Sequence, residues 1–319
     1  MAPLLEVEGL SVDIAIADGT LHAVRDLSFA VERGETLCLV GESGCGKSMT
    51  ALAVMDLLPR QAKRTVRRLH FEGRNLAKGA MEALRGDRVA MIFQEPMTAL
   101  NPAYTIGDQL TEGYLRHKGG SAVAARDRAV HLLEKVGIAS AAGRLRQYPH
   151  QLSGGLRQRV MIAMALMCDP DLLIADEPTT ALDVTIQAQI LRLLADLRRE
   201  LGIAMVLITH DLGIVARIAD RVAVMYAGEI VETASAQSLF RHPRHPYTQG
   251  LISCIPVPGR TRPGETLGVI PGVVPSLIGE ARGCSFRDRC GFAEARCAAA
   301  PPERIDAELH AWRCIREAA

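Results

Sequence analysis

The residues best suited to chemistry are the eight from Gly41 to Ser48, which read Gly-Glu-Ser-Gly-Cys-Gly-Lys-Ser. Glycines let backbone N–H groups close around phosphate oxygens, because no Cβ stands in the way. Lys47 would reach the β- and γ-phosphates of a nucleoside triphosphate, and the Ser48 hydroxyl would ligate Mg²⁺. The alternative is a glycine-rich turn that binds nothing. We call residues 41–48 the P-loop and predict a nucleotide site formed by Gly41, Glu42, Ser43, Gly44, Cys45, Gly46, Lys47, Ser48 and the following Met49.

The residues on either side of the P-loop predict the elements that would position it. Leu37–Val40 is an apolar run typical of a buried strand, and a helical pattern extends from Met49 to Leu58. A strand, a glycine loop and a helix in this order are the context in which the motif binds phosphate. The helix N-terminus adds unpaired N–H donors and a positive dipole end. The P-loop alone does not say what the nucleotide is used for.

Two further predicted strands end in side chains that suit phosphoryl chemistry. The strand at 88–93 is followed by Gln94, whose amide oxygen could reach Mg²⁺ or the attacking water. The apolar run from Leu172 ends in Asp176 and Glu177. Polar groups at the carboxyl ends of parallel strands face the ligand in α/β proteins. We therefore predict Ser48, Gln94 and Asp176 as Mg²⁺ ligands and Glu177 as the base that deprotonates water.

A serine with two glycines and a lone histidine complete the candidate set. Ser153 would cap a helix that runs to about Cys168, and Gly154 and Gly155 leave that helix end bare enough to accept a phosphate. The alternative is an ordinary turn. His210 follows the predicted strand at 204–208 and could donate a hydrogen bond to the γ-phosphate, although a lone histidine at such a place can also be structural.

The composition predicts a globular protein and gives no indication of a nucleic-acid-binding or membrane-spanning one. The 319 residues are 48% hydrophobic and 23% charged, which predicts a packed core. A net charge of +1 gives no bulk electrostatic reason to bind nucleic acid. No apolar run approaches the roughly 18 residues of a membrane span, and the N-terminus lacks the pattern of a signal peptide. We expect a reducing compartment in which thiols stay free.

The remaining elements are predicted from shorter patterns. Asp18-Gly19 indicates a hairpin between strands at 12–16 and 21–24, followed by strands at 27–31 and 36–40. Residues 103–150 read as helical, with an apolar stripe at Ala129, Leu132, Leu133 and Val136. Residues 60–87 are basic and weakly patterned, 95–102 read as a loop, and 241–280 as an extended connector.

Six pieces in order resemble the nucleotide-binding domain of an ATP-binding cassette (ABC) protein: the P-loop, Gln94, Leu152-Ser-Gly-Gly, Asp176-Glu177, Leu182-Asp183 and His210. The resemblance covers residues 4 to about 240. It implies an α/β P-loop NTPase (RecA-like) core with an antiparallel β subdomain and an α-helical signature subdomain at about 95–158. It also implies two domains facing head to tail, with ATP between one P-loop and the partner's Ser153, Gly154 and Gly155. Ile14 stands where the family often has an aromatic residue that stacks on adenine, so only apolar contact is expected there.

The stretches at 94–102, 153–163 and 245–248 resemble the D-type ATPase subunits of bacterial dipeptide/oligopeptide importers. The resemblance implies a nucleotide-binding domain at 1–240 and a peptide-importer extension at 241–319. It implies a second, F-type ATPase subunit, two transmembrane permease subunits and an extracytoplasmic substrate-binding protein, with the chain peripheral on the cytoplasmic face of the inner membrane. Nickel and glutathione importers are similar, so those substrates stay open. A soluble, non-transport ABC ATPase and an ATP-dependent iron–sulfur sensor are the other function classes.

Four of the eight cysteines, Cys284, Cys290, Cys297 and Cys314, lie in the last 36 residues with spacing C-x₅-C-x₆-C-x₁₆-C. In a reducing compartment such a group is more typical of metal ligation than of disulfides. Spacing alone fits a 4Fe–4S cluster and Zn²⁺ equally, and unligated core cysteines are the third alternative. The resemblance to peptide-importer ATPases favours the 4Fe–4S cluster. We expect Arg282, Arg287, Arg289 and Arg313 to offset the thiolate charge.

Overall fold

A computed structural model describes residues 2–76, 79–180, 182–255, 268–279 and 283–316. The chain forms two units. Unit 1 comprises residues 1–31, 36–75 and 209–319, and unit 2 comprises residues 32–35 and 76–208. Arg282 lies outside the described residues.

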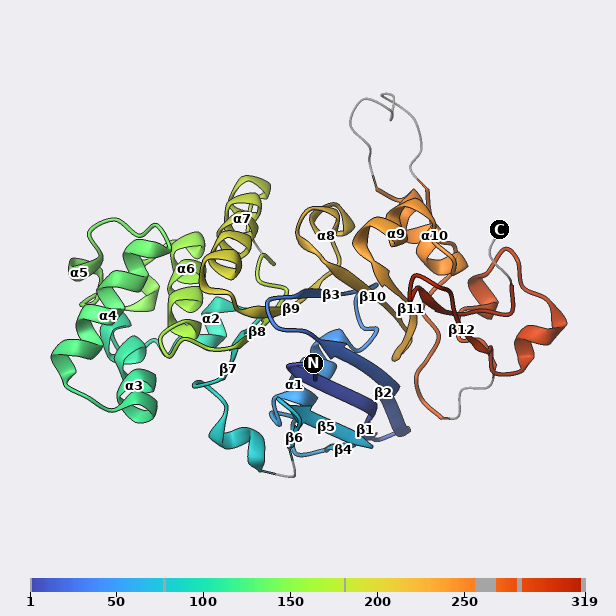
Figure 1. Ribbon diagram of the computed structural model, residues 1–319, viewed down its shortest axis with the longest axis horizontal. Helices are drawn as coiled ribbons and strands as arrows, with labels where there is room; N and C mark the ends of the chain where they lie inside the picture. Colours follow the sequence, from blue (N-terminus) through green and yellow to red (C-terminus); the bar gives the residue numbers. More distant parts are fainter. Residues whose placement is uncertain (1, 77–78, 181, 256–267, 280–282, 317–319) are drawn as a thin grey trace. The chain divides into compact units, whose positions relative to one another are not determined.

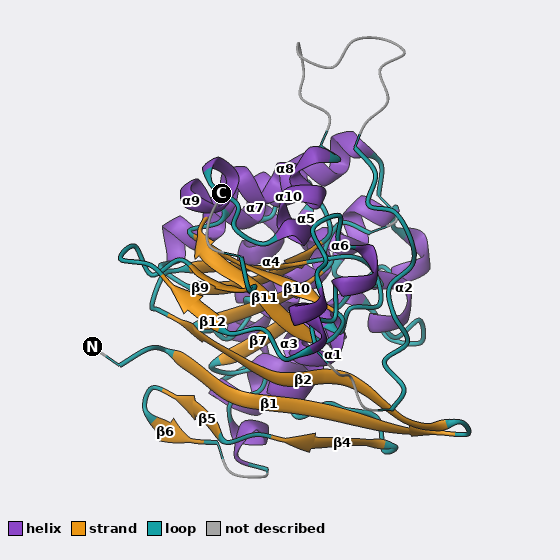
Figure 2. Cartoon of the chain, turned by 90° about the vertical axis from the view of Figure 1, so that its right-hand side faces the viewer, coloured by secondary structure: helices purple, strands orange, loops and turns teal. Residues whose placement is uncertain are grey.

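Unit 1 contains an antiparallel sheet with strand order β2-β1-β5-β6, in which β4 also pairs with β1 (Figure 1). Strands β1 (Leu5–Ile16) and β2 (Gly19–Val31) form the long hairpin seen in Figure 2, so the predicted hairpin is confirmed. The stretch predicted as a separate strand at 27–31 is the second half of β2. The weakly patterned region at 60–87 supplies β4 (Ala62–Thr65), β5 (Arg68–Phe71), β6 (Arg74–Asn75) and the 3₁₀ helix η1 (Ala80–Ala83).

A second set of strands in unit 1 has the order β12-β13-β11-β10-β3. The fully buried β3 (Thr36–Val40) pairs in parallel with β10 (Arg221–Tyr226), as expected for an apolar strand covered on both faces. The other strands are β11 (Glu229–Ser235), β12 (Glu303–Ile305) and β13 (Ala311–Arg313). The helices of this unit are α1 (Lys47–Val54), α8 (Leu212–Ile218), α9 (Ala236–Arg241), α10 (Pro246–Ser253), η3 (Arg287–Arg289) and η4 (Ala295–Ala298).

Unit 2 is built on parallel strands in the order β9-β8-β7. These are β7 (Val89–Ile92), the fully buried β8 (Leu172–Asp176) and β9 (Ala204–Thr209). Its helices are α2 (Pro96–Ala99), α3 (Ile106–Lys118), α4 (Ala122–Lys135), α5 (Ala141–Arg144), η2 (Pro149–Gln151), α6 (Gly154–Ala165) and α7 (Val184–Leu201). The chain is thus an α/β protein with an antiparallel β layer and a helical region, as predicted.

Side-chain caps explain where the helices of unit 2 begin. Thr105 and Asp108 form a capping box at the start of α3, and Asp183 accepts a hydrogen bond from the backbone N–H of Ile186 at the start of α7. The predicted apolar stripe of α4 is buried and packs α4 against α3 and α6. The cap of α3 and the stripe of α4 thus stabilise the helical region that precedes α6, and Asp183 fixes the start of α7 after it.

Some predicted stretches differ from the structure, either in where a helix ends or in containing a helix that was not predicted. Helix α1 ends at Val54 rather than Leu58, because Asp56 adopts a left-handed conformation with φ 55°. The predicted loop at 95–102 contains the short helix α2, and the predicted connector contains α10, whose N-cap is His245. No helix among the described residues is long and apolar enough to cross a membrane.

Candidate nucleotide site

Close backbone contacts explain the glycines of the P-loop. A Cβ on Gly41 would lie 2.1 Å from the carbonyl oxygen of Met225, and one on Gly46 would lie 2.2 Å from that of Ala23. Gly46 also has φ 103°, a conformation that L side chains rarely adopt. The loop therefore packs directly against neighbouring backbone in unit 1, and its shape depends on glycine at these two positions.

Lys47 is held inside the P-loop. Its side chain is largely buried, and Nζ donates hydrogen bonds of 2.9 Å to the carbonyl oxygens of both Gly41 and Glu42. Nζ also lies 3.7 Å from the Sγ of Cys45. Burial raises the pKa of the Cys45 thiol, while the Lys47 ammonium opposes that rise. The result is one cation at the centre of the loop, beside a neutral thiol.

The other nucleotide-site predictions that fall in unit 1 are at less enclosed positions. Ser48 and Met49 lie in the first turn of α1. Ile14 lies in β1 opposite Leu21 and Ala62 and is half-buried. His210 is exposed between β9 and α8, where the side chain of the next residue, Asp211, caps α8.

In unit 2, the structure brings Gln94 and Glu177 together. Nε2 of Gln94 donates a 3.3 Å hydrogen bond to Oε2 of Glu177, and the Thr180 hydroxyl donates one of 2.9 Å to the same oxygen. Asp176 is the buried last residue of β8. Glu177 has φ 42°, and its backbone N–H donates to the carbonyl oxygen of Ile208. A non-glycine residue held in this region is typical of functional sites.

Ser153 caps α6, with its Oγ accepting a 3.4 Å hydrogen bond from the N–H of Leu156. Ser153 and Gly154 are exposed. A Cβ on Gly155 would lie 3.1 Å from Cγ2 of Ile186 in α7, so the absence of a side chain allows α6 and α7 to begin close together. The N-terminus of α6 is thus exposed to solvent at Ser153 and Gly154, whereas Gly155 packs against α7.

The four cysteines of the segment at 283–316, which we call the cysteine segment, line one cavity with Phe286 and other side chains. The N–H of Cys284 donates to the carbonyl oxygen of Cys297. Burial raises the pKa of the Cys284 thiol to about 11, and the other three thiols add to the rise. No group of three or more His, Cys, Asp or Glu side chains is arranged to hold a metal ion in the part of the chain that the structure describes. The thiols are therefore gathered, but not in a coordinating geometry.

Arg289 differs from the prediction that it offsets thiolate charge. Its guanidinium forms a two-point ion pair with the P-loop carboxylate of Glu42, and this hydrogen-bonded pair raises the pKa of Arg289. Arg287 pairs with Asp288. Thr180, Tyr247 and Arg289 each contact a predicted site residue, a role that the sequence analysis assigns to none of them. Tyr247 and Arg289 reach Glu42 only because the fold brings distant segments together.

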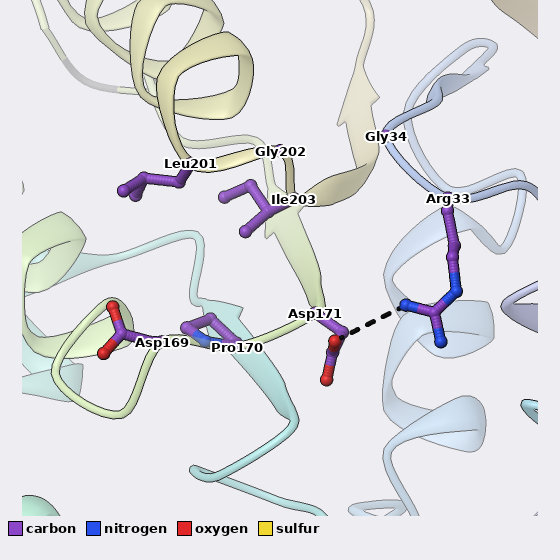
Figure 3. Close-up of a pocket in the computed structure, with 8 residues that line it drawn as sticks. All are labelled: Arg33, Gly34, Asp169, Pro170, Asp171, Leu201, Gly202 and Ile203. Carbon is purple, nitrogen blue, oxygen red and sulfur yellow. Dashed lines mark ion pairs between the residues drawn. The ribbon is translucent and has the colours of Figure 1, made fainter.

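A second cavity, in unit 2, lies away from the predicted chemistry. It is lined by Arg33, Gly34, Asp169, Pro170, Asp171, Leu201, Gly202 and Ile203 (Figure 3). Asp171 and Ile203 directly precede β8 and β9, so the cavity is at the amino ends of these strands. An ion pair of 3.6 Å joins Arg33 to Asp171 across it (Figure 3). Ligands of α/β sheets bind at the opposite, carboxyl ends, where Asp176 is found.

Comparison with known proteins identifies the chain's relatives. Residues 24–180 match the ABC transporter family, and residues 231–297 match the oligopeptide/dipeptide transporter C-terminal region. The dipeptide transport ATP-binding protein DppD of Bacillus subtilis (strain 168) is 49% identical over 319 residues, covering 98% of this chain and 95% of the relative. DppD of Escherichia coli (strain K12) is 49% identical over 302 residues, covering 94% and 92%.

Among solved structures, the dimeric ATP-binding cassette MJ0796 bound to ADP and Pi is similar, with a TM-score of 0.65 and 25% identity. The match covers 73% of this chain and 98% of that one. The chain therefore belongs to the ABC transporter family, and within it to the ATP-binding proteins that carry an oligopeptide/dipeptide transporter C-terminal region.

Proposed function

We propose that this chain is the ATP-hydrolysing subunit of an importer for dipeptides or oligopeptides. The observation that carries the proposal is the P-loop with Lys47 enclosed at its centre, in a chain that aligns over nearly its full length with dipeptide transport ATP-binding proteins. As an ABC ATPase the chain uses ATP and Mg²⁺. Residues 1–240 would form the nucleotide-binding domain, with the helical subdomain at about 95–158, and 241–319 the importer-specific extension.

Within this proposal, the P-loop residues bind the phosphates of ATP, and Ile14 offers apolar contact to the base. Ser48, Gln94 and Asp176 hold Mg²⁺, which neutralises charge on the phosphates. Glu177 accepts a proton from the attacking water, and the fixed position of its carboxylate supports that role. His210 and the Ser153-Gly154-Gly155 turn of a second ATPase subunit donate hydrogen bonds to the γ-phosphate.

The assembly that we propose is a pair of ATPase subunits, this chain and an F-type paralogue, on the cytoplasmic face of the inner membrane. They would drive two transmembrane permease subunits that receive peptide from an extracytoplasmic binding protein. The similar MJ0796 cassette is dimeric in its complex with ADP and Pi, which supports a paired arrangement. We propose no nucleic acid partner.

We also propose that Cys284, Cys290, Cys297 and Cys314 hold a 4Fe–4S cluster, with Zn²⁺ as the alternative. The donor set supports this, because four thiols face one cavity and thiolate is the ligand for both groups. The side chains would have to rearrange and lose their protons on loading, since burial now favours the neutral thiol of Cys284. When bound, the cluster would supply a structural crosslink.

Uptake measurements test the transport proposal. Deletion of the gene should abolish uptake of a labelled dipeptide, and the wild-type gene should restore it. A separate experiment identifies the partners: the chain is tagged in its source cells and purified from detergent-solubilised membranes, and its copurifying subunits and ATPase activity are determined. Loss of labelled nickel or glutathione uptake instead would reassign the substrate. Purification without any membrane subunit would favour a soluble, non-transport ABC ATPase.

A further inference from the structure

The P-loop of this chain is held from outside by the C-terminal extension. Nη1 of Arg289 lies 2.6 Å from Oε2 of Glu42, and Nη2 lies 3.0 Å from Oε1, so the guanidinium and the carboxylate meet at two points. The side chain of Arg289 is only 6% exposed and that of Glu42 is 25% exposed. A two-point pair with little access to water is among the stronger charged contacts in proteins, and it fixes orientation as well as distance.

A second residue of the extension contacts the same P-loop residue. The backbone N–H of Glu42 donates a 3.0 Å hydrogen bond to the hydroxyl of Tyr247 at the start of α10. Tyr247 is fully buried and packs on the rings of Tyr226 and Phe286. Phe286 belongs to the cysteine segment, so the tyrosine that holds Glu42 is itself held by that segment.

The contacts on Glu42 converge on the ammonium group of Lys47. The carbonyl oxygen of Glu42 accepts the hydrogen bond of the Lys47 ammonium, its N–H is bound by Tyr247, and its side chain is bound by Arg289. All three polar groups of this residue are therefore occupied. An ammonium that is already oriented loses less freedom when it binds phosphate, which favours tighter binding.

Arg289 is in turn fixed by the cysteine segment. It directly precedes Cys290, which lines the four-cysteine cavity, and its Nε donates a 2.8 Å hydrogen bond to the carbonyl oxygen of Pro271. The guanidinium also lies over the ring of Tyr226, 5.8 Å from the centroid. Any change that moves Cys290 would therefore move the group that holds Glu42.

We propose that Arg289 and Tyr247 are positioning residues of the P-loop, which make the nucleotide affinity of this chain depend on its cysteine segment. The inference rests on the proposed function only in assuming that the P-loop binds ATP. It assigns the C-terminal extension a part in nucleotide binding, carried by one ion pair and one hydrogen bond to Glu42.

The test is equilibrium binding of a fluorescent ATP analogue to the purified full chain, with steady-state ATPase kinetics alongside. Arg289→Ala should raise the Kd and the KM for ATP about tenfold, the scale of losing a charged hydrogen-bonded pair, while kcat at saturating ATP changes less than twofold. Arg289→Lys, which keeps the charge but not the two-point geometry, should give an intermediate Kd. Tyr247→Phe should weaken binding less than Arg289→Ala.

Double substitution shows whether Arg289 acts through Glu42. Glu42→Gln should weaken binding to a similar extent, and Arg289→Ala combined with Glu42→Gln should be no weaker than either alone. The matched control is Arg296→Ala, because Arg296 is an exposed arginine of the same segment that pairs with Glu294. It should leave the Kd unchanged.

Two outcomes would overturn the inference: an unchanged Kd in Arg289→Ala, or additive losses in the double variant. If Arg289→Ala does not fold, Arg289→Lys and Glu42→Gln decide in the same way. Failure of the wild-type chain to bind the analogue at all would instead refute the proposed function, so the two failures are distinguishable.

Discussion

Nε2 of Gln94, which follows β7, donates a hydrogen bond to Oε2 of Glu177, which follows β8, over 3.3 Å. The Thr180 hydroxyl binds the same oxygen, so one carboxylate oxygen is held by two neutral donors. Neutral donors orient a carboxylate without neutralising it. The Glu177 carboxylate is thus held in one orientation, as its proposed role of general base requires.

Glu177→Gln should therefore lower ATP turnover by about 10²–10⁴, the contribution of a general base, while ATP binding is retained. In the proposed pair of ATPase subunits, the closed state should persist longer, because the bound ATP is not consumed. Phosphate release and nucleotide retention on the purified chain measure the two effects. Thr180→Val is the matched control, since it removes one orienting bond but not the base, and should cost much less. Near-normal turnover in Glu177→Gln would assign the base elsewhere.

Lys47→Ala should abolish stabilisation of the chain by ATP. A ligand at 100 times its Kd stabilises the folded state by about 2.7 kcal/mol, so the wild-type melting temperature should rise with ATP and Mg²⁺. The variant loses the cation that now contacts the carbonyl oxygens of Gly41 and Glu42, and its melting temperature should not respond. Thermal melts with and without ATP measure this, and an equal rise in the variant would exclude Lys47 from the site.

The two glycines of the P-loop should differ in their tolerance of a methyl group. Gly46→Ala places a Cβ 2.2 Å from the carbonyl oxygen of Ala23, so the backbone must shift and the variant should lose several kcal/mol or fail to accumulate. In Gly44→Ala the new Cβ has no heavy atom within 4 Å, so the variant should lose only the cost of an alanine in the left-handed conformation, about 1–2 kcal/mol. Urea unfolding of both variants makes the comparison, and equal losses would contradict the contact argument.

Burial lowers the pKa of His245 from 6.5 to about 4, so this side chain is neutral in the folded protein. Above pH 6.5 the imidazole of His245 is neutral in both the folded and the unfolded chain, so its protonation does not reduce the free energy of unfolding. Between pH 6.5 and 4 only the unfolded chain protonates His245. The free energy of unfolding therefore decreases as the pH is lowered, by about 3 kcal/mol in total. Unfolding free energies of wild type and His245→Asn should converge as pH falls through this window, because asparagine can still cap α10 without titrating. A pH-independent difference would contradict the buried neutral state.

Metal analysis of protein purified without oxygen tests the cysteine segment. We expect about four iron atoms and four labile sulfides per chain, and a visible absorption band. Cys290→Ser should lower the iron content, whereas Cys254→Ser should not, because Cys254 is not among the residues that line the cavity. Stoichiometric zinc without colour would select the Zn²⁺ alternative, and neither metal would leave the four thiols as core residues.

The sequence predicts those parts of the fold whose signal is local. Strands β3, β8 and β9 are continuous apolar runs, because both faces of each strand are buried. Strands β4, β5 and β6 are two to four residues long and carry arginines, so pairing with β1 and with each other, rather than their own composition, makes them strands. Helix α10 is short and follows a proline-rich stretch, which hides its pattern.

The candidate site also has parts that can be predicted from local sequence and parts that depend on contacts between distant segments. The P-loop and the Asp176-Glu177 pair are recognisable because their chemistry requires neighbouring residues in a fixed order. The contact between Glu42 and Arg289 spans 247 positions, and an arginine among cysteines gives no indication that its partner is a distant glutamate. Such a contact depends on how the C-terminal extension packs, which no pattern within either segment encodes.

The pairing of β13 with β11 has a consequence for solubility. The short hairpin of β12 and β13 occupies the hydrogen-bonding edge of β11, at Glu232 and Thr233, and leaves the three-residue β12 as the outermost strand. Short outermost strands with charged side chains, here Glu303 and Arg304, resist the addition of strands from other molecules. A chain truncated before residue 303 would leave the edge of β11 unpaired at Glu232 and Thr233, so we expect the β12–β13 hairpin to protect the chain against aggregation.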